Sequence, residues 1–166
     1  MKNKHMSTSE LKSHIIEFLK DRSQGSLATC ADQVPRSSPV RYFLGNNLNI
    51  YILSAGGEKF NFIERNPRVC LLVNTDYVDF RQIKGVQIFG KAVTSLQEPR
   101  LFEEALQQCK MLGERKSQLY DLMLIKVIPE EIVYLNSLGD GDRTKQFLKL
   151  DKAVDESNEY RPAKKL

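Results

Sequence analysis

The sequence of 166 residues has no tryptophan, only two histidines and three cysteines, and each scarcity narrows the range of functions. His5 and His14 both lie near the N-terminus, which leaves no Ser-His-Asp or Cys-His set for nucleophilic catalysis. The same scarcity argues against a structural zinc, so we expect neither a metal site nor a catalytic side chain. Cys30, Cys70 and Cys109 are widely spaced in apolar surroundings, which is typical of reduced core thiols in a cytosolic protein.

Long apolar runs are missing as well. No stretch reaches the roughly 18 apolar residues that cross a bilayer, and the first segment, MKNKHMSTSELK, lacks the apolar core of a signal peptide. We therefore expect a cytoplasmic protein that does not enter a membrane. The net charge of +4 is small, and without a concentrated basic stripe we expect no nucleic-acid partner.

What the chain does contain is typical of one folded domain over residues 1–166. Hydrophobic residues make up 41% and charged residues 28%, close to the averages of globular proteins. Ser7 and Glu10 have the spacing of a capping box and precede apolar residues at helical spacing, which predicts a helix over about 8–20. A barrel over about 25–136 and a loosely held tail after about 152 complete the expected domain.

The β pattern predicts the fold class. About six short strands, turn signals at short intervals and a helix over 59–65 that bridges two strands are typical of a small closed or split sheet. We expect a mainly β fold, a small six-stranded antiparallel split β-barrel of Greek-key type with flanking α-helices. A ferredoxin-like sandwich is the structural alternative.

Four local features carry more detailed expectations. The continuous apolar run 69–73 predicts a strand buried on both faces, and Gly90 predicts a bulge inside the strand that contains it. Pro129 is expected to end a strand, because proline cannot donate to the ladder. Pro99 is expected to open a helix whose apolar positions continue to residue 112.

The polar chemistry of the chain gathers in RSSPVR at 36–41, YILSAGGEK at 51–59 and NPRV at 66–69. Hairpin pairing would place the first two side by side. Lys59 would then stand at a helix start, where unpaired N–H groups and the positive end of the helix dipole favour an anion. Arg36 and the Ser54 hydroxyl add a cation and a donor, which predicts a cradle for a dianionic phosphate. Pro39 and Val40 would offer apolar surface and backbone groups to a planar heterocycle.

Each of these residues also has a simpler structural explanation. Lys59 and Arg36 are charges of the kind that usually face solvent. Gly56 and Gly57 are common turn residues, and Ser54 is a common hydroxyl at a strand end. The spacing by itself therefore does not decide between two interpretations of these residues, a phosphate cradle and an ordinary surface.

The order RSSPV, IYILSAGGEK, NPRV and VQIFGKA resembles the flavin-binding split-barrel family of pyridoxamine 5'-phosphate oxidase, over about residues 20–135. The resemblance implies FMN as the cofactor, with its phosphate held by Arg36 and Lys59. Around the rest of the flavin it implies Ser37, Ser38, Pro39 and Val40 at the isoalloxazine, and Leu53 and Ser54 at the ribityl chain.

The chain departs from the family pattern in two places. Pyridoxamine 5'-phosphate oxidases resemble one another in a Trp-containing C-terminal segment ending in Arg-Leu-x-Pro, whereas this chain has no Trp and ends in AKKL. We therefore do not expect vitamin B6 oxidation. A position near the flavin pyrimidine, often Gln in those oxidases, aligns with Gly85, and Gln87 on the same strand face is the expected substitute.

The resemblance also implies a homodimer with each flavin at the subunit interface. Because the hydride chemistry belongs to the flavin, we expect an FMN-dependent oxidoreductase, a reductase or oxidase of an unidentified small molecule such as a nitro-aromatic or a quinone, with a nicotinamide donor. The alternative is a non-catalytic flavin-binding module that serves as an electron carrier, a stress-related protein or a flavin store. Haem in the same barrel is disfavoured by the scarcity of histidine, and a deazaflavin stays open as an alternative to FMN.

Overall fold

The structure, a computed structural model, describes residues 5–108 and 121–151. Its first element is helix α1 (Thr8–Lys20), which begins at a capping box. Ser7 Oγ accepts a hydrogen bond from the Glu10 backbone N–H, and the Glu10 carboxylate accepts one from the Ser7 backbone N–H. The helix and the cap predicted from the sequence are both confirmed.

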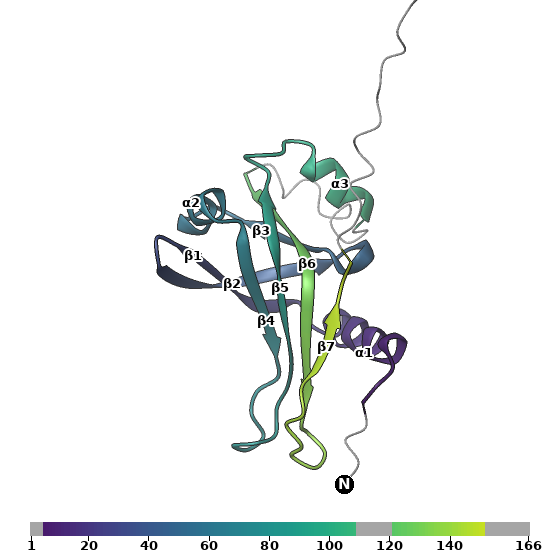
Figure 1. The fold of residues 1–166 in the computed structure, drawn as a ribbon. Coiled ribbons are helices and arrows are strands. Elements are labelled where there is room, and N and C mark those ends of the chain that lie inside the picture. The colour runs from purple at the N-terminus through teal and green to yellow at the C-terminus, as the bar shows by residue number, and fades with distance from the viewer. Residues whose placement is uncertain (1–4, 109–120, 152–166) are drawn as a thin grey trace, which may run out of the picture.

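Seven antiparallel strands form one sheet that closes into a split barrel (Figure 1). Their order is β3-β2-β1-β4-β5-β6-β7, and a further pairing between β3 and β6 closes the ring. This closure confirms the predicted mainly β split barrel and excludes the alternative prediction, a ferredoxin-like sandwich. The strands are β1 (Gln24–Ala31), β2 (Val34–Leu44), β3 (Ile50–Ser54), β4 (Arg68–Asn74), β5 (Lys84–Thr94), β6 (Met123–Asn136) and β7 (Gln146–Lys149).

The main core fills the barrel, and two further helices cover its outside (Figure 1). α1 contributes Ile15 to this core, where it joins strand residues such as Leu27, Leu71 and Ile88, all fully buried. Helix α2 (Glu58–Arg65) packs against β1 and β5, and helix α3 (Leu101–Gln108) packs against β6. A short 3-10 turn, η1 (Asn46–Leu48), links β2 to β3.

Strand β4 is buried on one face only, so the prediction of two buried faces is wrong. Val69 and Val73 point into the core, whereas Leu72 is 38% exposed. In an antiparallel barrel one face of each strand looks outward, and among residues 5–108 and 121–151 nothing covers Leu72 fully. Cys70 lies on the same outer face and, like Cys30, is a free, half-buried thiol, so neither is a core thiol of the kind expected.

The predicted bulge at Gly90 is confirmed, and it explains a second departure. The register of β5 against β6 shifts between Phe89 and Gly90, which leaves Glu130 of β6 as the extra residue. A Cβ at Gly90 would lie 2.1 Å from the carbonyl oxygen of Ile128. Because the bulge interrupts the ladder, Pro129 fits inside one continuous 14-residue strand, and the expectation that it ends a strand is wrong.

The remaining differences lie at the C-terminal side. Strand β7 was not predicted, because only Leu148 of its four residues is buried, and it raises the number of strands from six to seven. The expected continuation of α3 to residue 112, Cys109 and the tail after 152 lie outside the described residues. No helix in the described part of the chain is long and apolar enough to cross a membrane.

Candidate cofactor site

The turn between β3 and α2 is built from two glycines. Gly56 and Gly57 have φ angles of +119° and +107°, which L side chains rarely adopt. Gly57 is also the N-cap of α2, and no side chain caps this helix, in contrast to Ser7 at α1. The first N–H groups of α2 therefore lack a side-chain cap, and the positive end of the helix dipole lies at the same place.

Ser54 and Lys59 approach this turn from its two sides. Lys59 Nζ donates a hydrogen bond to the Gly56 carbonyl oxygen at 2.5 Å, and Ser54 Oγ donates to the same oxygen at 3.1 Å. Partial burial disfavours the charged form of Lys59 and lowers the pKa of its ammonium group below the usual value. An anionic partner in this turn would favour the charged form again.

Arg36 reaches the same helix from β2. Its guanidinium lies over the ring of Phe62, with 5.0 Å between Cζ and the ring centroid, in a cation–π contact. Phe62 follows Lys59 by three residues, so the two are neighbours on one side of α2. The structure therefore places both predicted cations on the same side of this helix.

The NPRV motif at 66–69 fixes α2 against the hairpin that carries Arg36. Asn66 Nδ2 donates a hydrogen bond to the Cys30 carbonyl oxygen at 2.8 Å, and Arg65 forms an ion pair with Asp32 in the turn between β1 and β2. The contact of this motif with β1 was not predicted from the sequence. The available signal was an asparagine between a helix end and a proline.

The expected ring-lining residues of β2 divide between the two faces of the sheet. Ser38 and Val40 share the inner face with Arg36, and Val40 is buried in the core. Ser37 and Pro39 point outward and are exposed. A planar ring on the outside of β2 would therefore meet the side chains of Ser37 and Pro39, and Val40 only through its backbone.

Leu53 lies next to Ser54 on β3 but faces the opposite side of the strand. It is half-buried against a small cluster under α3 that includes Leu101 and Leu124. Directly across the ladder from Leu53 stands Arg41 of β2. The side chain of Leu53 therefore points away from the glycine turn, and only its backbone lies close to that turn.

Gln87 lies on the outer face of β5, away from Lys59. Gln87 pairs with Leu72 of the neighbouring strand β4. In the same row across the sheet, Leu72 pairs with Ser26 of β1, and Ser26 pairs with Pro39 of β2. Gln87 and Pro39 thus share a face but are three strand spacings apart, on the order of 14 Å. Within one chain the structure does not bring Gln87 to the other candidate residues, and it lines a separate cavity of about 270 Å³.

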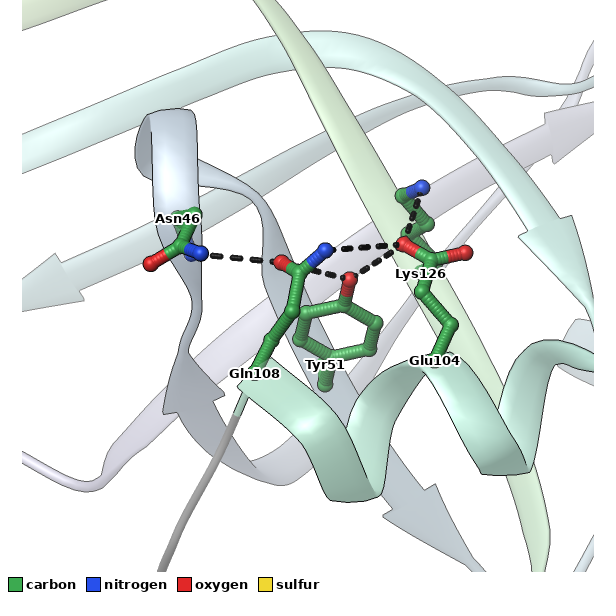
Figure 2. A network of polar contacts seen from close by, with 5 residues as sticks. All are labelled: Asn46, Tyr51, Glu104, Gln108 and Lys126. Atoms are coloured by element: carbon green, nitrogen blue, oxygen red, sulfur yellow. Dashed lines mark hydrogen bonds and ion pairs between the residues drawn. The ribbon is translucent and has the colours of Figure 1, made fainter. Parts of the chain in front are cut away.

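A polar network beneath α3 was missed by the sequence analysis. Tyr51 is fully buried, and its hydroxyl and the Lys126 ammonium both donate to Glu104 Oε1 at 2.5 Å (Figure 2). Gln108 accepts a hydrogen bond from the Asn46 backbone. Burial by itself would raise the pKa of Glu104, but the hydrogen bonds from Lys126 and Tyr51 outweigh it and hold that pKa below its usual value. The signal available in the sequence was Lys126, a lysine inside an apolar run, because a charge in such a place needs a polar partner.

Solved structures of known proteins share this fold. General Stress Protein 26 from Bacillus anthracis str. Sterne is similar over 85% of this chain and 99% of its own, at 21% identity and a TM-score of 0.60. A FAD-binding protein from Mesorhizobium loti is similar over 76% and 92%, at 19% identity and a TM-score of 0.57. A heme binding protein from Mycobacterium smegmatis is similar over 86% of this chain and 58% of its own, at 16% identity and a TM-score of 0.62.

Sequence comparison gives the family. A search of curated proteins finds no significant match. The sequence profile of the family described as pyridoxamine 5'-phosphate oxidase, however, matches residues 11–136, which is most of the chain and includes α2 and every strand of the closed ring. The chain therefore belongs to the pyridoxamine 5'-phosphate oxidase family.

Proposed function

We propose that the protein binds FMN, with the flavin phosphate at the start of α2. The observation that carries this proposal is the convergence of Ser54 and Lys59 on a glycine turn before an uncapped helix, with Arg36 on the same side of that helix. A phosphate there would accept charge-assisted hydrogen bonds worth roughly 1.5–3 kcal/mol each, and less from the exposed Arg36. The family and the FAD-binding neighbour support a flavin as the ligand.

The isoalloxazine is assigned to the outer surface of β2. The side chains of Ser37 and Pro39 would line it, because they face outward from the strand, and the backbone of Ser38 and Val40 would lie beside it. The ribityl chain would pass Leu53 and Ser54 between the ring and the phosphate. Since β1 and β4 separate Gln87 from β2, Gln87 is assigned to a flavin that lies between two copies of the chain, and its amide would face the pyrimidine edge.

A homodimer is part of this proposal. Leu72 and Phe89 are each 38% exposed on the outer face of β4 and β5, and Phe147 of β7 is 58% exposed. Large apolar side chains gathered on one outer face are typical of an interaction surface. A second copy would cover this face, and an obligate interface of this kind buries roughly 2,000 Å² or more.

The activity proposed for the bound protein is that of an FMN-dependent oxidoreductase acting on a small molecule. FMN would supply the hydride-accepting centre, and the chain would hold the phosphate, orient the ring and keep water away from it. No catalytic side chain is assigned. The likeness to a general stress protein favours a second candidate, a flavin-binding module without turnover.

Haem is the competing cofactor, because one structural neighbour is a heme binding protein. The two histidines of this chain, His5 and His14, both precede β1 and are remote in sequence from the glycine turn. The chemistry of Arg36, Ser54 and Lys59 suits a phosphate and offers no axial ligand of the usual kind. These residues therefore support flavin over haem.

The absorption spectrum of the freshly purified protein tests the proposal, followed by identification of what denaturation releases. We expect a flavin spectrum and released FMN. A Soret band or a ligand without a phosphate would contradict it. If FMN is present, oxidation of a nicotinamide donor with a quinone or a nitro-aromatic acceptor then distinguishes an oxidoreductase, which turns over, from a binding module, which does not.

A further inference from the structure

Phe62 is buried although it stands beside the apolar stripe of α2 and not in it. Phe60 and Ile63 form that stripe and belong to the main core. Phe62 lies on the flank of the helix that it shares with Lys59, three residues earlier. It belongs to neither of the two apolar clusters of the described chain, yet only 7% of it is exposed. The burial of this ring therefore has a cause other than the core.

The guanidinium of Arg36 lies over this ring, with 5.0 Å between Cζ and the ring centroid. Arg36 belongs to β2 and Phe62 to α2. The two elements are held together, because α2 packs against β1, the partner strand of β2, and Arg65 of α2 pairs with Asp32 in the turn between the two strands. The fold thus fixes the elements that carry the cation and the ring.

This contact uses the face of the guanidinium and leaves its edge free. A cation–π contact engages the planar face, whereas the five N–H donors of an arginine point outward in the plane. Among residues 5–108 and 121–151, Arg36 forms no ion pair with a carboxylate. Asp32, the acidic residue nearest to it along the chain, is engaged by Arg65. The N–H donors of Arg36 are therefore available to an anionic ligand.

An arginine that is already held loses less freedom when a ligand binds. A free arginine samples many rotamers, and ordering it on binding weakens the affinity. Lys59, on the same flank of α2 as Phe62, has its own tether in the Gly56 carbonyl oxygen. Each cation of the candidate phosphate site thus has one contact that orders it, Lys59 with Gly56 and Arg36 with Phe62.

We propose that Phe62 is a positioning residue that holds Arg36 for the phosphate of the flavin. This inference rests on the proposed function, because it needs a phosphate at the start of α2. Phe62 acts through Arg36 and not by touching the flavin, so its effect is confined to ligands that carry a phosphate. It contributes to the preference for FMN over riboflavin and leaves the affinity for the flavin ring unchanged.

The ratio of the dissociation constants of riboflavin and FMN, measured by quenching of flavin fluorescence in the purified full chain, tests the proposal. F62L keeps a large apolar side chain but removes the ring face, and it should lower this ratio about fivefold by weakening FMN alone. F62Y keeps the ring face and should stay within about twofold of the parent ratio. N61A changes an exposed residue of the same helix and is the matched control, which should leave the ratio unchanged.

The double variant R36A/F62L separates positioning from packing. If Phe62 acts through Arg36, F62L should change the ratio by less than about twofold once Arg36 is absent. An equal loss with and without Arg36 would overturn the proposal, because it would show that Phe62 only supports α2. Urea unfolding verifies that each variant folds, and F62M takes the place of F62L if F62L does not.

The contact itself can be measured by NMR without any flavin. Protons that lie over the face of an aromatic ring are shielded, so the side-chain protons of Arg36, assigned by their loss in R36A, should resonate upfield in the parent and in F62Y. They should move downfield in F62L. Absence of the upfield shift in the parent would overturn the proposal.

The same variants distinguish this proposal from the proposed function. If R36A loses the preference for FMN and F62L keeps it, the role of Phe62 is refuted and the phosphate site stands. If the parent protein binds FMN and riboflavin equally, the phosphate site is refuted and the role of Phe62 with it.

Discussion

Lys59 Nζ and Ser54 Oγ donate hydrogen bonds to the same acceptor, the carbonyl oxygen of Gly56. The two donors come from different elements, α2 and the end of β3, and they meet because Gly56 and Gly57 turn the chain with positive φ angles. A phosphate oxygen is a stronger acceptor than a neutral carbonyl. The fold thus positions donors for a phosphate before a ligand arrives.

Removing either cation should weaken FMN binding. K59A and R36A are each expected to raise the dissociation constant of FMN at least roughly tenfold, because each removes a charge-assisted hydrogen bond to the phosphate. Quenching of flavin fluorescence measures the affinity. K91A, which changes an exposed lysine of β5, is the control and should bind FMN normally. Unchanged affinity in both cradle variants would remove these residues from the phosphate site.

The affinity for FMN should fall at alkaline pH. Lys59 is cationic below its pKa, and burial lowers that pKa from the ordinary value of 10.5. The attraction to the phosphate is therefore present at neutral pH and is lost as the pH rises through the lowered pKa, earlier than for an exposed lysine. Titration of K59R should move the loss to higher pH, since arginine stays charged. A parallel decline for riboflavin, which has no phosphate, would contradict this explanation.

The network under α3 should stabilise the protein at neutral pH. Y51F is expected to lower the free energy of unfolding by about 1–2 kcal/mol, because it leaves Glu104 with one donor fewer. Urea unfolding followed by circular dichroism measures the change.

The same network predicts a pH dependence. The folded-state pKa of Glu104 lies below 4.5, so its contribution is present above that pH and is lost as the pH falls through the folded-state pKa. E104Q should remove part of the acid sensitivity and cost about 1 kcal/mol at neutral pH, since Glu104 is only partly buried. E103Q, on the exposed side of the same helix, is the control. Identical unfolding of E104Q and E103Q at neutral pH would show that the network contributes nothing.

The bulge at Gly90 should not tolerate a side chain. A Cβ there would lie 2.1 Å from the Ile128 carbonyl oxygen, so G90A should lower the free energy of unfolding by at least about 2 kcal/mol through a forced backbone shift. G139A is the matched control, because a Cβ at Gly139 has nothing within 4 Å. It should change stability by less than about 0.5 kcal/mol. Equal denaturation midpoints for G90A and G139A would show that the bulge adapts freely.

Local signals in the sequence predicted the elements that local interactions form. The capping box of Ser7 and Glu10 and the glycines before α2 are both decided within a few residues. The exposure of Leu72 was not predictable in this way, because it depends on what covers the outer face of β4. The passage of Pro129 through β6 depends on the register of a partner strand, which the sequence of β6 does not contain.

The candidate site shows the same division. Arg36, Ser54 and Lys59 lie in short motifs that could be found by spacing and by resemblance. The contact between Asn66 and Cys30 joins positions 36 residues apart, and the contact between Tyr51 and Glu104 joins positions 53 residues apart. No periodicity relates such pairs, so only the folded chain shows them.

Comparing the affinity of the protein for FMN and for riboflavin tests the central claim most directly, because the two differ only in the phosphate. We predict that the parent protein binds FMN at least roughly a hundredfold more tightly, and that the double variant R36A/K59A loses most of this preference. Equal affinity of the parent protein for both flavins would contradict a phosphate site at the start of α2.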